Sequence, residues 1–140
     1  MLVLLLLLTA CDGLLLNGDA SMKSRDPSVA FFSYLTDNIV NPSAGTRMTF
    51  RGVDVNTGSA YDATTGVFTA PVPGVYSFAF TASGCNVQCS SITVVHLNKG
   101  DTVWMEIPSA TGSNTVAGHG NFDGGDQYHT HFSGFLIHSD

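Results

Sequence analysis

The sequence predicts an all-β protein, a sandwich or barrel built from many short strands. Only 11% of its 140 residues are charged, whereas a globular domain usually has about 25%. Ser, Thr, Asn and Gly take the place of the missing charged residues. Apolar and polar residues alternate over several short segments, and turns rich in Gly, Pro and Asn separate these segments at regular spacing. Alternation with period two is typical of half-buried strands, and the sequence contains no heptad repeat and no amphipathic helical pattern.

The expected strands follow one another from residue 28 to the end of the chain. Pro71 and Pro73 argue against a central strand where they lie, because proline cannot donate a ladder hydrogen bond. Residues 109–127 form a long Gly-rich loop, and a loop of this length in a compact domain is often functional. The segments with strand character are 28–35, 46–55, 59–74 (short extended pieces around a turn at 62–66), 74–82, 91–97, 101–107 and 131–138.

Alternation also predicts which side chains share a face of each strand. Tyr76, Phe78 and Phe80 fall on one face of their segment. In the next segment Ile92, Val94 and His96 fall together. We interpret five aromatic residues as core or subunit-contact residues rather than as a ligand-binding site. They are Tyr76, Phe78, Phe80, Phe132 and Phe135. The last alternating set is Val103, Met105 and Ile107, with Trp104 on the opposite face.

The first 20 residues are predicted to be a secretory signal peptide. The apolar run Leu2–Leu8 is too short for a membrane span, which needs about 20 residues. Cleavage after Ala20 would start the secreted chain near Ser21, although cleavage after Ala10 also fits, and Leu8–Cys11 has the form of a lipidation signal. Residues 21–27 read as a polar lead-in, and residues 28–140 as one domain.

Charge and motifs exclude two classes of function. The formal charge of −6 and the isoelectric point near 5.0 argue against nucleic acid as a partner, because counterion release needs clustered Lys and Arg. No Ser or Cys lies in a nucleophile motif, and no pair of carboxylates has a plausible catalytic spacing. The sequence therefore predicts a protein that is not an enzyme.

Four segments of the chain resemble the C1q globular-head domain, which belongs with tumour-necrosis-factor-like proteins. These segments are "VAFFSYL" (29–35), "AYDATTGVFTAPVPGVYSFAF" (60–80), "VVHLNKGDTVWMEI" (94–107) and "FSGFLIHSD" (132–140). They occur in family order, and the second resembles stalkless invertebrate, mollusc-like members most. The resemblance implies a secreted protein with a two-sheet jelly roll, assembled as a homotrimer, that binds ligands without catalysis.

One departure from the family pattern lies between residues 81 and 89, "TASGCNVQC". Family members have a hairpin of two further outer-sheet strands at this place, each of about 5–6 residues. The sequence therefore predicts a jelly roll shortened by one outer-sheet hairpin, with Cys85 and Cys89 as a disulfide across the short connection; two free thiols are the alternative. By the same resemblance, the outer sheet would keep only the strands around 48–55, 61–70 and 101–107. The inner face near Phe80 and Ile92 would then lack part of its cover. Where family members bind calcium, the ligands come largely from the loops around that hairpin, so no cofactor is carried over.

A weak set of ligand-binding residues remains. Trp104 is an aromatic side chain of the kind that carbohydrate sites use, provided that it is exposed. Asp123, Asp126, His129 and His131 lie together near the last strand, and imidazole suits zinc or copper while carboxylates suit calcium. The mixture predicts no single ion. A Cys₂His₂ set of Cys85, Cys89, His129 and His131 has an unusual spacing, and a polar loop is the simpler interpretation.

The sequence thus predicts a secreted recognition protein of innate immunity. By resemblance, it would bind microbial surface glycans or lipopolysaccharide as a multivalent lectin. Two alternatives stay open, an extracellular structural or metal-carrying protein and a cytokine-like ligand.

Overall fold

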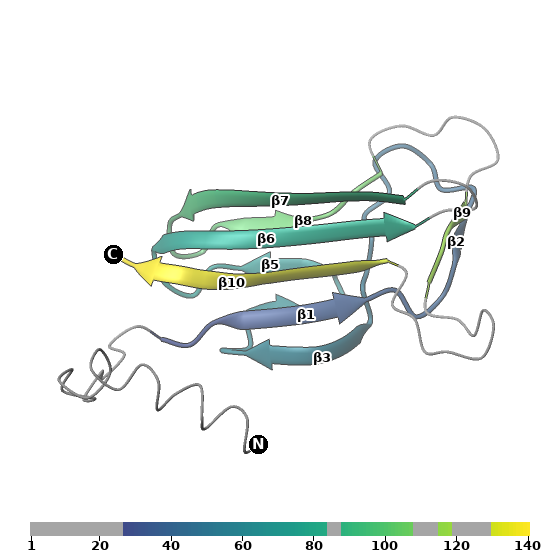
Figure 1. The fold of residues 1–140 in the computed structure, drawn as a ribbon. Helices are drawn as coiled ribbons and strands as arrows, with labels where there is room; N and C mark the ends of the chain where they lie inside the picture. The colour runs from purple at the N-terminus through teal and green to yellow at the C-terminus, as the bar shows by residue number, and fades with distance from the viewer. Residues whose placement is uncertain (1–26, 84–87, 108–114, 119–129) are drawn as a thin grey trace, which may run out of the picture.

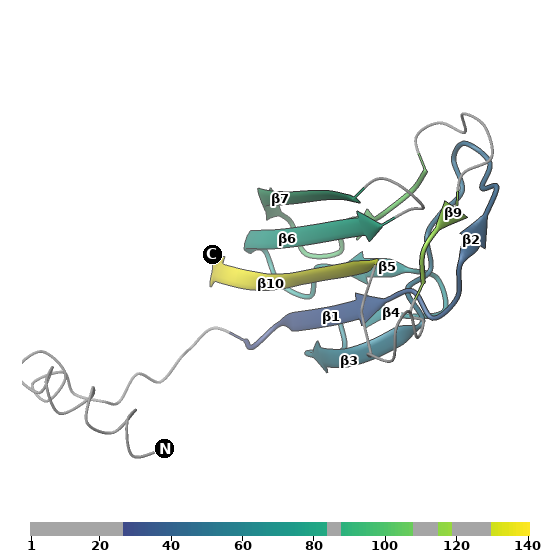
Figure 2. The ribbon, with the colours of Figure 1, turned by 45° about the vertical axis from the view of Figure 1, so that its right-hand side comes forward.

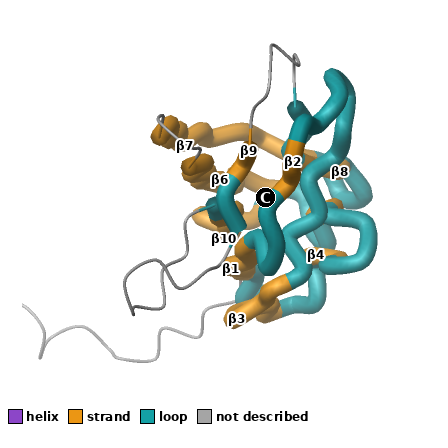
Figure 3. Tube along the Cα trace, turned by 90° about the vertical axis from the view of Figure 1, so that its right-hand side faces the viewer, coloured by secondary structure: helices purple, strands orange, loops and turns teal. Residues whose placement is uncertain are grey.

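The computed structural model describes residues 27–83, 88–107, 115–118 and 130–140. Within these residues all the regular elements are β-strands, as the sequence predicts. The strands form two layers that pack face to face, with the larger sheet in front and the smaller sheet behind it (Figure 1). The end-on view in Figure 3 shows the two layers side by side.

The larger sheet has five strands in the order β3-β1-β10-β6-β7, and each neighbouring pair is antiparallel. The chain's last strand therefore lies in the middle of this sheet, between its first strand and β6. The bounds of the strands are β1 Ala30–Tyr34, β3 Gly52–Thr57, β6 Gly74–Ser83, β7 Gln88–Leu97 and β10 His131–Ser139.

The smaller sheet has three short strands, β4 (Tyr61–Asp62), β5 (Val67–Thr69) and β8 (Thr102–Trp104), in that order. A further two-stranded sheet pairs β2 (Ile39–Val40) with β9 (Thr115–Val116). Figure 2 shows this pair beside one end of the sandwich, where it continues neither of the two main sheets.

Aromatic side chains from both sheets fill the space between the layers. The ring of Phe31 lies 4.7 Å from Tyr61, 5.4 Å from Phe68 and 4.9 Å from Phe132, measured between ring centroids. Phe78 packs 5.2 Å from Phe68 in an edge-to-face arrangement. Such ring pairs contribute about 0.5–1.5 kcal/mol each beyond the area that they bury. The rings therefore join β1, β6 and β10 of one sheet to β4 and β5 of the other.

Gly134 lies in the centre of β10, where a side chain would enter this aromatic core. A Cβ atom there would lie 2.5 Å from Cδ1 of Phe78 and 2.8 Å from Cε1 of Phe31. The absence of a side chain at residue 134 is therefore what lets the two rings cover the middle strand.

The segment from 46 to 57 crosses from one sheet to the other, which corrects the expectation that it lies wholly in the outer sheet. Its first part pairs with the smaller sheet, since the Met48 amide donates to the Met105 carbonyl at 2.9 Å. Its second part is β3, which pairs with β1 in the larger sheet. Phe50, between them, is fully buried. Alternation alone does not say which neighbour each half of a long strand takes.

The connection between β6 and β7 confirms the prediction of a shortened domain. These two strands pair directly along ten residue pairs, from Gly74↔Leu97 to Ser83↔Gln88. Only residues 84–87 separate them, and those residues lie outside the described part of the chain. In the described residues β7 and β8 each pair with a single neighbour, and both strands lie along the upper edge of the sandwich in Figure 1.

The face left uncovered by the short connection differs from the sequence prediction. Phe80 pairs with Ser91 and points toward the interior, whereas Ile92 pairs with Ala79 and points away from it. Phe80 and Ile92 therefore do not share a face. The inward positions of β7 opposite Phe78 and Phe80 are Thr93 and Ser91, both exposed. Small hydroxyl side chains occupy the open part of the strand, which lowers the apolar area left without cover.

Two phenylalanines on β10 give a direct test of this core. Phe132 is 1% exposed and Phe135 is 52% exposed. We expect Phe132→Ala to lower the free energy of unfolding by about 3–5 kcal/mol, because it leaves a cavity among packed rings. The matched variant Phe135→Ala should cost less than about 1 kcal/mol. Denaturant unfolding of the monomer at low concentration measures both, and equal losses would contradict this core.

The shortened connection gives a second test. Inserting a relative's two-strand hairpin between Ala82 and Ser91 should raise the melting temperature and reduce binding of a hydrophobic dye, because the new strands would cover the inward face of β7 and the free edge of β8. An insertion of equal length made only of Gly and Ser is the control. If the hairpin changes neither quantity relative to that control, the gap is already filled.

Candidate functional site

Several of the predicted site residues lie outside the described part of the chain. These are Cys85, Asp123, Asp126 and His129. Cys89 is in β7, and it is exposed. Because its expected partner is not described, the disulfide stays a prediction.

The two predicted ligand residues that the structure does describe lie on opposite sheets. His131 begins β10 and pairs with Tyr34 and Thr81 on the outward face of the larger sheet, with its ring 5.4 Å from that of Phe32. Trp104 ends β8 in the smaller sheet. The structure therefore does not bring these two side chains into one site, and each has to be considered in its own surroundings.

Trp104 projects from the exposed face of the smaller sheet, as alternation predicts. Its side chain is 40% exposed, while Val103 and Met105 on either side pack against the core. The guanidinium carbon of Arg47 lies 4.9 Å from the centre of the indole ring, within the range of a cation–π contact. The indole N–H donates to Oε2 of Glu106 at 3.2 Å. Arg47 and Glu106 also form a β-bridge, so one backbone contact fixes both partners of the tryptophan.

A shallow groove of about 480 Å³ adjoins this tryptophan on the same side of the molecule. Two of its lining residues adjoin Trp104. Arg47 makes the cation–π contact with the indole ring, and Val67 pairs with Trp104 across the sheet. Both apolar and hydroxyl side chains line it. The lining residues are Arg47, Gly58, Ser59, Ala60, Asp62, Thr65, Val67, Thr69 and Pro71.

Asp62 is the acidic side chain of the groove, and a turn holds it in place. Its Oδ2 accepts a hydrogen bond from the Thr65 hydroxyl and its Oδ1 accepts one from the Thr64 amide, both at 2.8 Å. The Thr65 hydrogen bond, followed by the Thr64 bond, lowers the pKa of the Asp62 carboxyl from its usual range. The group is therefore ionised at neutral pH, and its orientation is fixed before any ligand arrives.

Two other depressions have less to offer a ligand. One of about 170 Å³ lies between Leu35, Asp37 and Arg51. The other, of about 340 Å³, lies where β1 begins, with Phe135 and Ile137 in its wall and no charged side chain. Pockets that bind small molecules usually combine apolar walls with a few placed polar groups, and of the three the groove beside Trp104 fits that description best.

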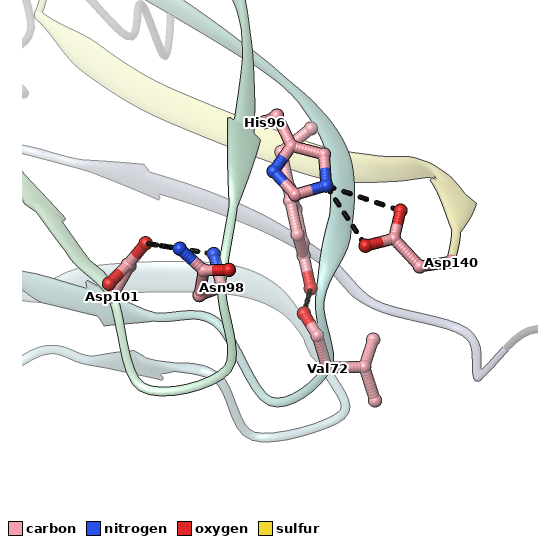
Figure 4. Close-up of polar contacts among 6 residues, drawn as sticks. Val72, His96, Asn98, Asp101 and Asp140 are labelled. Atoms are coloured by element: carbon pink, nitrogen blue, oxygen red, sulfur yellow. Dashed lines mark hydrogen bonds and ion pairs between the residues drawn. The ribbon is translucent and has the colours of Figure 1, made fainter.

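The polar contacts near the end of β7 hold strand ends and a turn in place, and they do not converge on one point where a ligand could bind. His96 Nε2 lies 2.9 Å from Oδ2 of Asp140, which ties the last residue of the chain to β7. Asp101 Oδ2 accepts from the Asn98 amide at 2.8 Å in the turn before β8. Figure 4 shows these groups spread along the strand ends. Among the residues that the structure describes, no three His, Cys, Asp or Glu side chains gather where they could hold a metal ion.

Two neighbouring rows of side chains on the outward side of the larger sheet contain no charged residue and are largely apolar. The register aligns Val55, Phe32, Ser133, Ala79 and Ile92 in one row across its five strands. Ile92 is 75% exposed, which is unusual for isoleucine. The next row consists of Thr57, Ala30, Phe135, Ser77 and Val94. We call these two rows the outward face.

A two-layer antiparallel sandwich with these segments in this order is a jelly roll of the C1q type, and comparison with known proteins agrees. The model of the C1q domain family matches residues 30–93 and 83–137. The chain therefore belongs to the C1q domain family. The two matched stretches overlap at the β6–β7 connection, where the sequence departs from the family pattern.

Three related proteins match most of this chain. It is 32% identical to rat complement C1q tumor necrosis factor-related protein 5, covering 84% of this chain and 56% of the relative. It is 28% identical to the mouse protein 3 of that series, with 78% of this chain and 51% of the relative covered. The mouse collagen alpha-1(X) chain is 24% identical, with coverage of 69% and 17%. The chain thus spans about half the length of the first two relatives.

A solved structure, the globular domain of a zebrafish complement 1qA protein, is similar over 81% of this chain and 99% of its own, at 19% identity and a TM-score of 0.39. Separately, none of the described segments is a helix of the length and apolarity that crossing a membrane requires.

Sequence reasoning identified Trp104 but missed the groove beside it. Arg47 lies far from Trp104 along the chain, and only the pairing of residues 46–48 with 105–107 brings them together. The one local signal was the turn at 62–66, where an Asp two residues before Thr64 is typical of a side chain that caps its own turn.

The histidines near the last strand give a further test. We expect His129→Ala combined with His131→Ala to leave the melting temperature unchanged within about 2 °C, because His131 is half-buried at the start of β10 rather than in the core. Circular dichroism melting measures this, with Thr130→Ala as the comparison that should destabilise, since Thr130 is fully buried. A loss of several kcal/mol in the double variant would mean that the histidines are core or ligand residues.

Proposed function

We propose that this protein is a secreted, multivalent recognition protein that binds surface glycans of microbes and is not an enzyme. It assembles as a homotrimer, and each subunit contributes one weak site. Family membership supports the general class, because the chain is related over most of its length to proteins named for complement C1q.

The observation that carries this proposal is the outward face of the larger sheet. Monomeric proteins rarely expose a continuous apolar area beyond a few hundred Å². Here Ile92 and Val94 on β7 and Phe135 on β10, all at least half exposed, are separated by β6, and neither row contains a charged residue. Burial of such a face between identical subunits would remove it from water at about 25 cal/mol per Å².

Association through this face leaves the opposite side of the molecule free. The groove and Trp104 belong to the smaller sheet, which lies on the other layer of the sandwich (Figure 3). Each subunit of an assembly would therefore present its groove outward. Linked sites of this kind raise avidity over a single site by about 10²–10⁴ without any new contact.

A second function is a cytokine-like ligand for a cell-surface receptor. The relatives' own names, which contain "tumor necrosis factor-related", favour this alternative. Saturable binding to host cells, with no binding to microbial polysaccharide, would distinguish it.

One experiment tests assembly and binding together. We expect the wild-type protein to run as an oligomer in size-exclusion chromatography with light scattering, and the variant Ile92→Ser with Phe135→Ser to run as a folded monomer. The monomer should be retained at least a hundredfold less on immobilised microbial polysaccharide, because avidity is lost. Val40→Ser is the matched control, since Val40 is exposed but lies outside the outward face, in β2.

Either of two results would contradict the proposal. A wild-type protein that is monomeric at high concentration has no multivalent form. Equal retention of the monomeric variant and the wild type would show that the outward face does not contribute to binding.

A further inference from the structure

We propose that the groove beside Trp104 is the saccharide-binding site of this chain, and that its ligand is an uncharged sugar rather than a phosphorylated or sulfated one. This inference rests on the proposed function, because it assigns the glycan site of that protein to particular residues.

The charge of the groove decides the class of sugar. Among the described residues that line it, Arg47 is the only cation and Asp62 the only anion, so their charges cancel. Glu106, which accepts from the Trp104 indole, adds a second carboxylate close by. Sites for phosphate and sulfate groups usually gather several cations or backbone amides. A net charge of zero or below at this surface disfavours such anions and suits a neutral ring.

The Asp62 carboxylate is arranged to accept hydrogen bonds from sugar hydroxyl groups. A carboxylate has about four lone-pair sites on its two oxygens. The Thr64 amide and the Thr65 hydroxyl each occupy one site, on different oxygens. The Thr65 amide and the Thr64 hydroxyl also interact with this carboxyl. Because the turn already holds the carboxylate in one orientation, a sugar hydroxyl that donates to it requires no reorientation of the group.

Arg47 supplies hydrogen-bond donors to the groove. Its guanidinium carbon lies 4.9 Å from the centre of the Trp104 ring, a cation–π contact, and a guanidinium carries five N–H donors. The hydroxyls of Ser59, Thr65 and Thr69 add groups that both donate and accept. A sugar hydroxyl also donates and accepts, so these partners complement one another.

The apolar part of the lining fits the C–H face of a sugar ring. Val67 lies across the sheet from Trp104, and Ala60 and Pro71 also line the groove. A pyranose presents an apolar face of C–H groups together with a rim of hydroxyls. The groove, at about 480 Å³, combines both kinds of surface and is large enough for one or two such rings.

The single tryptophan of the chain makes the test direct. Trp104 is the only tryptophan in the sequence, so selectively excited tryptophan emission reports only on this place. We expect mannan or dextran, both neutral polysaccharides, to shift the emission in a saturable way. Heparin and lipid A, which carry sulfate or phosphate, should bind at least tenfold more weakly.

The variants separate the groove from the rest of the molecule. Arg47→Gln and Thr69→Val should each weaken binding of the neutral polysaccharide about tenfold, measured by retention on the immobilised polymer as well as by emission. Thr69→Val leaves the contact between Arg47 and Trp104 intact, so its emission signal stays comparable with the wild type. Arg51→Gln is the matched control, because Arg51 is an exposed arginine that lines the depression near Asp37 instead. Equal oligomeric states and melting temperatures are established first.

The outcomes are distinguishable. Binding of a neutral probe that is weakened in Arg47→Gln and Thr69→Val but not in Arg51→Gln supports the site. Binding that both groove variants retain would overturn the site and leave the proposed function standing. A preference for heparin or lipid A would overturn the assignment of an uncharged ligand. Failure of the wild type to bind any of the four probes would overturn the proposed function and this inference with it.

Discussion

The ring of Phe31 is the contact on which the rest of this structure depends. It comes from the first strand of the larger sheet and packs against Tyr61 and Phe68 of the smaller sheet. It also packs against Phe132 of the middle strand. Without this cluster the short strands β4, β5 and β8 would have little to hold them, because isolated short strands are marginal in water. The groove beside Trp104 is built on those strands, so the site depends on the core beneath it.

The two faces of the sandwich follow from the same pleated geometry. In each strand the inward residues join the aromatic core, and the outward residues are left to water or to a partner. On the larger sheet two outward rows contain no charged residue and are mostly apolar, as Ile92 and Phe135 illustrate. On the smaller sheet they are mixed, with Asp62, Val67 and Trp104 in one cross-strand row. One face therefore suits contact between subunits and the other suits a polar ligand.

Much of this arrangement could be predicted from the sequence, because half-buried strands show an alternation of apolar and polar residues. Tyr76 and Phe78 were placed correctly in the core and Trp104 correctly on the opposite face of its strand. The crossing of residues 46–57 between sheets could not be predicted, since alternation is the same whichever neighbour a strand pairs with. The relation of Ile92 to Phe80 was misjudged for a similar reason, because it depends on register across the β6–β7 pair. Register also explains why Arg47 was missed: its contact with Trp104 depends on a bridge between distant segments.

The central claim is that the aromatic core makes both sheets one cooperative unit, and native-state hydrogen exchange tests it most directly. Two amides report on the two sheets. The Thr69 amide donates to the Ala60 carbonyl at 2.8 Å beside the smaller sheet, and the Leu136 amide donates to the Val29 carbonyl at 2.9 Å in the larger one. If the sheets unfold together, both amides will exchange with the same opening free energy, equal to that of global unfolding. An opening free energy for Thr69 several kcal/mol below that for Leu136 would show that the smaller sheet opens alone, and would contradict the claim.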